Sequence, residues 1–342
     1  MKTFTANDFN YVLPPERIAQ YPSDQRGGSR LLVLDRHLKK ISHQHFIDFI
    51  DMIDANDLLI FNDTKVIPAR LLGYKTSGGK IECLVERLLS EKVVLAHVRA
   101  SKSPKPGSVL ILAKHIRVRV LKQCDGLFEL EFLSESPVLT LLHQYGEVPL
   151  PPYLNRAPEF SDKERYQTIF AKYEGSVAAP TAALHFDEVM LQRLTQKGVS
   201  IAKVTLHIGA GTFQPVRVKQ LSQHVMHKEY LEVSETLCNA VRQCKARGGR
   251  VVAVGTTVVR CLETAAAKGE IEPYQGVTQL FIHPGYQFRC VDALLTNFHF
   301  PKSTLLMLVC AFGGYESVMQ AYRLAVENHY RFFSYGDAMV VV

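Results

Sequence analysis

Helical and extended hydrophobic patterns alternate along the second half of the chain. The stretch 187–198 has apolar residues at helical spacing, an aspartate in the N-cap position and a glycine at its end. The alternation continues with a predicted strand, helix, strand and helix at 199–208, 234–247, 250–255 and 256–267. This order is typical of an α/β layer with parallel strands, whose loops gather at the carboxyl ends of the strands.

The first part of the chain has the same kind of pattern. A strand is predicted at 31–34, an amphipathic helix near 46–53 and a strand at 58–61. We expect these elements to belong to the same layer as the second half of the chain.

The intervening residues follow a different pattern. Short apolar runs alternate with turns rich in Gly, Pro and Lys, at 81–85, 93–98, 109–112, 116–121 and 127–132. Short strands at this spacing are typical of a small barrel or sandwich. Four prolines in 149–158 disfavour both helix and central strand, so a stiff linker is expected there.

We therefore predict a mixed α/β main domain with an inserted small all-β barrel domain. The catalytic α/β domain is discontinuous and comprises 1–71 and 150–342, and the basic barrel comprises 72–149. At 342 residues and 47% hydrophobic content, the chain is long enough to bury the cores of two domains.

The net charge of +7 is unevenly distributed. Residues 71–124 contain eleven Lys or Arg and three acidic residues, a balance of +8, which leaves 7 − 8 = −1 for the rest. A basic module on a balanced protein indicates a polyanionic partner such as RNA. On charge alone, a solvated face of a small β domain explains the excess equally well.

The chain shows no signal for secretion or membrane insertion. Its N-terminus lacks a basic region followed by an apolar core, and its longest apolar run, 305–312, is far below the ~20 residues that span a bilayer. Seven cysteines without a C-x-x-C pair favour a reducing compartment, so we expect a cytoplasmic protein. No H-E-x-x-H or similar cluster occurs, and no catalytic metal is expected.

A polar turn interrupts the apolar stretch 281–312. Pro301 cannot continue a strand ladder or a helix interior, so the predicted order is a strand up to Leu295, a turn, and a helix from about Ser303. Such a turn between buried elements is a natural floor for a binding cleft. The alternative is a turn that only reverses the chain.

A second polar turn ends a predicted strand at Gly255. Thr256 and Thr257 open the next helix, so their hydroxyls and backbone N–H groups can hold a carboxylate or a ribose oxygen. Arg260, one turn on, can present its guanidinium to a carboxylate. The alternative is an ordinary threonine cap with Arg260 paired to Glu263.

Two histidines lie in polar turns with apolar flanks, which makes His185 and His299 candidates for acid–base chemistry. The alternative is that each is a hydrogen-bonded structural residue, as most histidines in such turns are. Asp63, after the apolar run 58–61, can act as a base or close an Asx turn.

Seven motifs in one order link the chain to a known family. They include FNYVLPPERIAQYP near the start, FNDTKVIPARL, GSVAAPTAALHF, HIGAGTFQPV, VAVGTTVVRCLE and the 281–312 stretch in the interior, and YRFFSYGDAM at the end. With them the chain resembles the S-adenosylmethionine:tRNA ribosyltransferase-isomerases of queuosine biosynthesis. It departs from the expected pattern at Asn10, where we expect Asp, and at Ala183, where Gly is usual.

The resemblance implies a reaction and its partners. The ribosyl group of S-adenosylmethionine, which is consumed as donor, is transferred with isomerisation to 7-aminomethyl-7-deazaguanine at the wobble position of a tRNA. Epoxyqueuosine forms, and adenine and methionine are released. No metal, membrane or obligate protein partner is implied, and a monomer is expected.

The resemblance also directs the choice of site residues. For proton handling we select His185, His299 and Asp63, and we place Thr256, Thr257 and Arg260 on the methionine carboxylate or the ribose. The full predicted substrate-binding set is Asn62, Lys65, Arg70, Thr181, His207, Gly209, Gly211, Thr212, Thr256, Thr257, Arg260, Glu263 and Asn297. The predicted RNA-binding residues are Lys75, Lys80, Lys102, Lys105, Lys114, Arg117 and Arg119.

Two other functions remain open from the residues. An S-adenosylmethionine-dependent RNA methyltransferase shares the substrate class, but it usually has a glycine-rich loop after its first strand, and none follows 31–34 or 58–61. A non-catalytic RNA-binding translation factor built on the basic barrel leaves the polar turns of the α/β part without a purpose.

Overall fold

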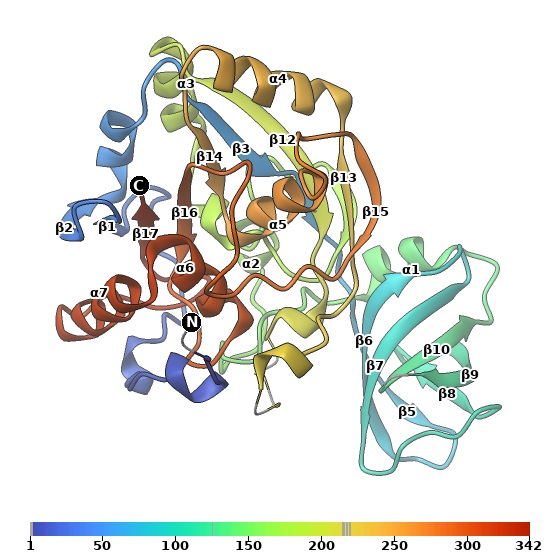
Figure 1. Ribbon diagram of the computed structural model, residues 1–342. Coiled ribbons are helices and arrows are strands. Elements are labelled where there is room, and N and C mark those ends of the chain that lie inside the picture. The colour runs from blue at the N-terminus through green and yellow to red at the C-terminus, as the bar shows by residue number, and fades with distance from the viewer. Residues whose placement is uncertain (1–2, 125, 214–215, 217, 219) are drawn as a thin grey trace.

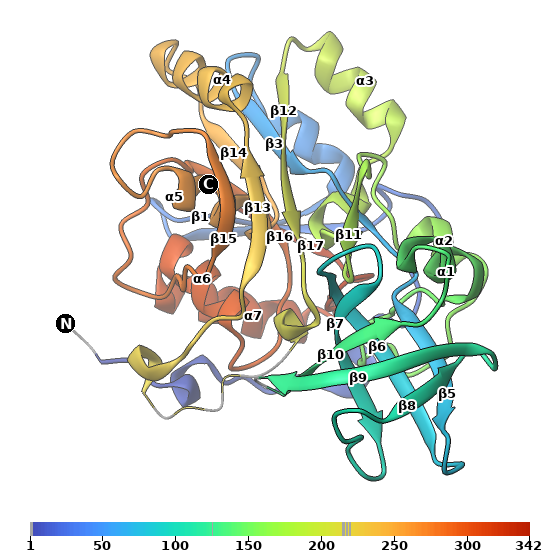
Figure 2. The ribbon, with the colours of Figure 1, turned by 90° about the vertical axis from the view of Figure 1, so that its right-hand side faces the viewer.

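The computed structural model describes residues 3–124, 126–213, 216, 218 and 220–342. It forms a large α/β body around one sheet and a smaller β-barrel beside it (Figure 1). The view in Figure 2 shows the barrel packed against one end of the larger body, near β11 (Tyr173–Ser176). The predicted fold class, a mixed α/β domain with a small barrel, is confirmed.

The central sheet has nine strands in the order β15-β13-β12-β3-β14-β16-β17-β1-β2. The four central strands, β12, β3, β14 and β16, are mutually parallel, as predicted, and the strands outside them make the sheet mixed. The bounds are β1 Arg30–Asp35, β2 Lys40–His45, β3 Leu58–Asn62, β12 Ser200–His207, β13 Glu229–Val233, β14 Val251–Val254, β15 Tyr274–Thr278, β16 Ala293–Asn297 and β17 Ala338–Val341.

Both faces of this sheet are covered. Leu58 and Ile60 of β3 point into one core with the longer helices, whereas Leu59 and Phe61 point into another with α3. Burial on both faces explains why β3 and β14 are continuous apolar runs. The helices are α3 Glu188–Gln196, α4 Glu235–Ala246, α5 Thr256–Ala265, α6 Thr304–Gly313 and α7 Tyr315–Glu327.

The predicted helix starts are confirmed by their caps. Asp187 accepts a hydrogen bond from the Met190 amide at 2.7 Å, and Ser234 and Ser303 cap α4 and α6. The stretch near 46–53 differs from the prediction, because it forms a 3-10 helix, Phe46–Met52. Phe46 and Phe49, three residues apart, stack on the same side of that helix.

The barrel is closed, with strand order β10-β7-β6-β5-β8-β9 and a hydrophobic core of its own. Its strands are β5 Arg70–Lys75, β6 Lys80–Leu88, β7 Val93–Ala100, β8 Val109–Leu112, β9 Ile116–Cys124 and β10 Leu127–Phe132. The helix α1 (Val138–Tyr145) packs on this core, and α2 (Asp162–Arg165) follows the linker. The expected division between residues 71 and 72 falls within β5, and a short β4 (Thr64–Val66) precedes it.

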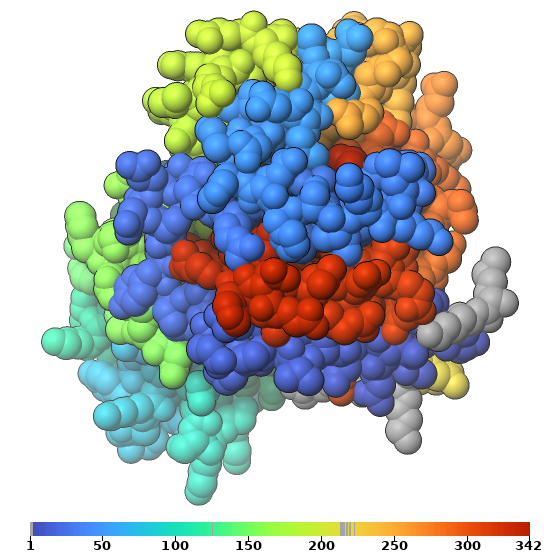
Figure 3. Space-filling model, turned by 90° about the vertical axis from the view of Figure 1, so that its left-hand side faces the viewer, coloured from blue at the N-terminus to red at the C-terminus, as the bar shows by residue number. Residues whose placement is uncertain are grey.

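The two ends of the chain pack against each other. In Figure 3 the C-terminal helices, in red, lie against the N-terminal segments, in blue. The backbones of Arg17 and Phe332 are hydrogen bonded, and the Tyr315 hydroxyl donates to the Asp8 carbonyl at 2.7 Å. The opening and closing sequence motifs therefore form one structural unit.

Among the described residues, no single helix is long and apolar enough to cross a membrane. α6 and α7 meet the length and composition test only as a pair, and the pair is bent by 117°.

Candidate functional site

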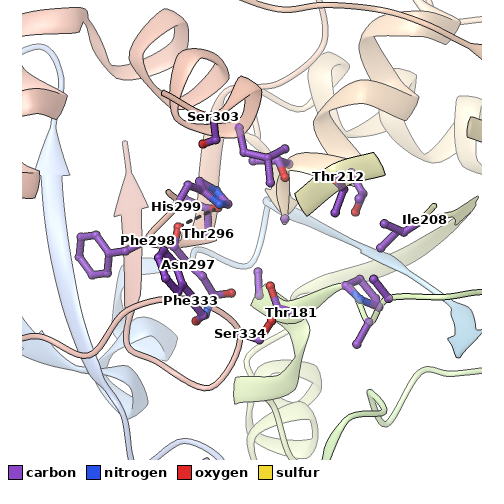
Figure 4. Close-up of a pocket in the computed structure, with 18 of the residues that line it drawn as sticks. Thr181, Ile208, Thr212, Thr296, Asn297, Phe298, His299, Ser303, Phe333 and Ser334 are labelled. Carbon is purple, nitrogen blue, oxygen red and sulfur yellow. Dashed lines mark hydrogen bonds between the residues drawn. The ribbon is translucent and has the colours of Figure 1, made fainter. Parts of the chain in front are cut away.

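A cavity opens at the carboxyl ends of the parallel strands. It is lined by the turns after β12, β14 and β16, by residues 178–182 and by Phe333 and Ser334 (Figure 4). This edge of a parallel sheet is where α/β proteins usually bind ligands. The two predicted polar turns, 255–257 and 296–304, thus meet in one place.

The turn after β16 places the imidazole of His299 at the cavity in a fixed position. The Nε2 atom of His299 lies 2.9 Å from the Thr296 hydroxyl, and its backbone N–H and carbonyl are bound to the hydroxyls of Tyr322 and Tyr11. Desolvation by burial lowers the pKa of His299 to about 3. The ring is therefore neutral at physiological pH, with its position set by three contacts.

Asn297 lines the cavity beside His299 (Figure 4). Its Nδ2 atom donates to the Phe333 carbonyl and to His185 Nε2, each at 3.1 Å. A carbonyl can only accept, so the Phe333 contact determines which way the amide is oriented. The Oδ1 atom is buried and has no hydrogen-bond partner within the described parts of the chain.

His185 does not line this cavity. Because its Nε2 accepts from Asn297, its Nδ1 carries the proton and donates to the Ser29 hydroxyl at 2.7 Å. The ring stacks on Phe46, and burial together with Arg26 and Arg331 lowers its pKa to about 4. Both nitrogens are thus occupied, and the ring orients Asn297.

Thr256 and Thr257 line the cavity at the first turn of α5. Gly255 has φ 101°, a conformation that favours glycine, and it turns the chain from β14 into the helix. The N-terminal N–H groups of α5 therefore point towards the cavity end of the sheet.

Arg260 lies deeper in the same helix and is 4% exposed. Its guanidinium pairs with the carboxylate of Glu229, not with Glu263 as in the alternative interpretation. It also donates from Nε to the Leu280 carbonyl at 3.2 Å, while Nη2 is buried without a partner among the residues that the structure describes. Burial lowers its pKa to about 10. Arg260 lines a second cavity, which shares Thr212 with the first.

Glu263 is fully buried and does not reach the cavity. Its carboxylate accepts hydrogen bonds from the backbone N–H groups of Arg289, Cys290 and Val291 and from the Tyr286 hydroxyl. These contacts hold the chain before β16.

Asn62, the last residue of β3, and Asp63, which follows it, are both engaged within the protein. Asn62 binds the backbone of Leu206 on both sides and accepts from the Thr64 amide, so it closes the Asx turn. Asp63 accepts from the Thr205 hydroxyl at 2.7 Å, and burial raises its pKa. Neither residue lines the cavity.

The other predicted substrate-binding residues divide into two groups. Thr181 and Thr212 line the cavity, together with Thr256, Thr257 and Asn297. Lys65 pairs with Glu174 and Arg70 with Glu82, and His207, with its pKa lowered by burial, binds the Thr64 hydroxyl. Those three residues, with Gly209 and Gly211, are outside the lining.

Comparison with known proteins identifies the family of this chain. The model of the family described as "Queuosine biosynthesis protein" matches residues 6–341. The chain belongs to this family. The suspected resemblance is confirmed.

Members of the queuosine biosynthesis family are similar over nearly the whole chain. Proteins of two Coxiella burnetii strains, Dugway 5J108-111 and CbuK_Q154, are each 58% identical over 335 residues, 98% of both chains, and are named S-adenosylmethionine:tRNA ribosyltransferase-isomerase. A crystal structure of S-adenosylmethionine tRNA ribosyltransferase from Thermotoga maritima is 38% identical. Its TM-score is 0.58, with coverage of 98% of this chain and 100% of that one.

The two departures from the family pattern have simple structural settings. Ala183 is fully buried in the core that also contains Phe46 and Phe186, and its φ is not positive. An alanine therefore fits there without backbone strain. Asn10 follows the first 3-10 helix and is exposed.

Sequence reasoning missed an aromatic wall of the cavity. Phe300 and Phe333 stack with ring centroids 3.7 Å apart, and Tyr153 packs on both rings. Tyr153 comes from the proline-rich linker and Phe333 from the closing motif. The available signal was the pair of aromatic residues in that motif.

The predicted RNA-binding residues all lie on the barrel or its turns, and all but the half-buried Lys75 are exposed. The strand β10 carries acidic residues that lie beyond the segment 71–124, and they offset part of the positive charge of the barrel. Glu131 pairs with Arg119, and Glu129 pairs with Lys122, which is not in the predicted RNA-binding set. Lys75 donates to the Lys102 carbonyl.

Within the described residues, no group of three or more His, Cys, Asp or Glu is arranged to hold a metal ion. Residues 214 and 215 of the HIGAGTFQPV motif lie outside the described residues.

Proposed function

We propose that this protein is an S-adenosylmethionine:tRNA ribosyltransferase-isomerase that acts in queuosine tRNA modification. The observation that carries the proposal is 58% identity over 98% of the chain to proteins of that name. The cavity adds a site of suitable chemistry, with an aromatic wall on one side and polar turns on the other.

The proposed reaction moves the ribosyl group of S-adenosylmethionine to the aminomethyl group of 7-aminomethyl-7-deazaguanine in a tRNA, and releases adenine and methionine. The positive sulfur acidifies the adjacent ribose C–H, so a proton acceptor is needed there. The attacking amine must be neutral, and the departing adenine needs a hydrogen-bond donor or acid. We propose that the reaction needs no metal ion, because the positive charge of the sulfonium itself activates the adjacent ribose C–H.

We assign the adenosine part of the substrate to the cavity of Figure 4. The stacked Phe300 and Phe333 offer a flat apolar wall for adenine. The Oδ1 atom of Asn297, which has no partner among the described residues, can accept from an amino or hydroxyl group of the ligand. Thr256 and Thr257 would bind the ribose or the methionine carboxylate at the N-terminus of α5. Thr181 and Thr212 complete this set.

Proton transfer is assigned to His299, the predicted catalytic histidine that lines the cavity. Asp63 remains the proposed carboxylate, although it does not line the cavity; burial raises its pKa. We change the proposed role of His185 from proton transfer to positioning, because it does not line the cavity and is hydrogen bonded to Asn297, which does.

We propose binding or supporting roles for the remaining predicted residues. The Nη2 atom of Arg260, which has no partner in the described part of the chain, would bind a methionine carboxylate in the second cavity. Contacts around the cavity would be supported by Asn62, Lys65, Arg70, His207, Gly209, Gly211 and Glu263.

We assign tRNA affinity to the barrel, which carries the charge excess. With β5 included, the barrel domain starts at residue 70 and not 72, and the α/β domain is formed by the segments on either side. We further propose a cytoplasmic monomer.

The proposed reaction can be tested with isotopically labelled S-adenosylmethionine. S-adenosylmethionine labelled in the ribose, or in the methyl group, is supplied to tRNA carrying 7-aminomethyl-7-deazaguanine. Ribose label in the tRNA, with methyl label leaving in methionine and with a chelator having no effect, supports the proposal. Methyl label in the tRNA would establish a methyltransferase, and no transfer of either label would favour a binding protein.

A further inference from the structure

A β-bulge in the barrel aims one carboxylate at the α/β body. In the pairing of β6 with β7, Val85 faces Ala96 and Arg87 faces Leu95, so Glu86 is the extra residue between them. Bulges turn a side chain away from the regular alternation of a strand. The side chain of Glu86 is only 13% exposed.

The carboxylate is held against a loop of the other body. Glu86 Oε2 accepts a hydrogen bond from the Ala210 backbone N–H at 2.9 Å, and His97 Nε2 lies 3.3 Å from the same oxygen. A Cβ atom on Gly209 would come within 2.1 Å of Glu86 Oε1. The glycine therefore leaves the space into which the carboxylate fits.

This loop belongs to both the cavity and the boundary between the two bodies. Ile208 and Thr212, on either side of it, line the cavity of Figure 4, whereas Ala210 packs against the hydrophobic core of the barrel. On the other side, the Ser176 hydroxyl accepts from the Ile208 amide at 2.9 Å. The position of Thr212 in the cavity thus depends on contacts from two directions, one of them supplied by the barrel.

We propose that Glu86 is a positioning residue that couples the barrel to the substrate cavity. By binding the Ala210 amide, it holds the 208–212 loop in the conformation that presents Thr212 to S-adenosylmethionine. Because the same carboxylate is part of the barrel, engagement of tRNA by the barrel and binding of S-adenosylmethionine in the cavity favour each other. This inference rests on the proposed function.

The first test is independent of any substrate. Glu86→Ala removes the acceptor, and Glu91→Ala removes an exposed acidic residue of the same barrel as a matched control. A hydrogen bond to a charged group corresponds to about tenfold or more in local opening, so amide exchange at Ala210 should accelerate by at least that factor in Glu86→Ala. Exchange should be unchanged in Glu91→Ala. Equal exchange rates in wild type and Glu86→Ala would overturn the contact itself.

The second test measures coupling. In the wild-type enzyme, saturating tRNA should lower the Kd for S-adenosylmethionine, and in Glu86→Ala this dependence should be lost, while the Kd for tRNA alone stays unchanged. Glu86→Gln, which keeps an acceptor oxygen, should be intermediate. An equal effect of tRNA in wild type and Glu86→Ala would overturn the proposal. If the wild type transfers no ribosyl label at all, the proposed function is wrong. Amide exchange at Ala210 still tests whether Glu86 binds the Ala210 amide, because that experiment needs no substrate.

Gly209→Ala gives a check that does not depend on the folding of Glu86→Ala. The φ of Gly209 is not positive, so alanine is tolerated by the backbone and displaces only the carboxylate. The single variants should therefore have the same effect on S-adenosylmethionine affinity, and the double variant should be no worse than either one. Additive losses in the double variant would contradict a shared contact.

Discussion

The cavity and the barrel surface hold their polar groups in opposite ways. Around the cavity, His185, Asn297 and Glu263 are buried, and most of their polar atoms are bound to neighbouring segments. On the barrel, cations such as Lys80 and Arg117 are exposed to solvent. A buried group is held in one orientation, and its loss leaves partners unsatisfied, whereas an exposed cation acts mainly through its charge.

The largest effect is expected at the buried ion pair. Arg260→Ala leaves Glu229 as an unpaired buried charge, which should lower the free energy of unfolding by about 3–5 kcal/mol. The measurement is chemical denaturation of wild type, Arg260→Ala and the double variant Arg260→Ala/Glu229→Ala. The double variant should recover part of the loss, since no lone charge remains. If Arg260→Ala were as stable as wild type, the ion pair would be hydrated, and the contrast between buried groups near the cavity and exposed cations on the barrel would be wrong.

The next effect concerns orientation in the cavity. Asn297→Ala removes the amide that links His185 and Phe333 to the site, and kcat/KM for ribosyl transfer should fall by about 10²–10³, typical of a lost polar group in an active site. The Kd for tRNA should be unchanged, because the barrel is untouched. His185→Ala should lower kcat/KM less than Asn297→Ala, since His185 acts through the amide. A greater loss in His185→Ala would restore a direct catalytic role for that histidine.

Acid should destabilise the folded protein through the buried histidines of the cavity region. His185 has a pKa of about 4 in the folded protein and 6.5 as its ordinary value, so the unfolded state binds more protons between these values. The contribution of His185 to stability should fall as pH decreases from 6.5 and be fully lost, roughly 3 kcal/mol, below pH 4. His299, with a pKa of about 3, adds a loss of the same sign. Urea unfolding at pH 7 and pH 5 measures this change. His185→Gln should reduce the change in the free energy of unfolding between the two pH values. If the change were as large in this variant as in wild type, other titratable groups would cause it.

The smallest effect on the fold is expected from the barrel cations. Arg117→Glu with Arg119→Glu should weaken tRNA binding and flatten its salt dependence, because each lost phosphate contact removes about 0.9 from the slope of log K against log salt. Lys268→Glu with Arg323→Glu, two exposed charges on the α/β body, is the matched control. Affinity for S-adenosylmethionine should not change in either. An equal loss of tRNA binding in the control would place RNA on the larger body as well.

Much of the fold was predictable because its signals are local. Caps such as Asp187 and Ser303 and the apolar runs of the central strands mark the elements directly. β13 and β15 were not predicted, since β15 at the sheet edge and β13 beside it alternate more and less buried residues and carry Tyr, Glu and Gly in place of an apolar run. β5 was not recognised as a barrel strand because its partners, β6 and β8, lie later in the chain.

The site was predictable to the same extent. The polar turns at Gly255 and Asn297 were recognised because each follows a buried strand, and both line the cavity. The aromatic wall was missed, since Tyr153, Phe300 and Phe333 come from three separate segments. The role of His185 was also not visible, because a residue type in a turn does not show what its nitrogens contact.

The sequence by itself determined the periodic elements, their caps, the basic insertion and the family, since each depends on residues close in the chain or on their order. Only the tertiary structure decided which polar groups line the cavity and which support it. Asn297 meets His185 across 112 residues of chain, and Glu86 meets Ala210 across 124. Contacts over such separations depend on how sheet, helices and barrel pack together, and no local spacing of residue types specifies that packing.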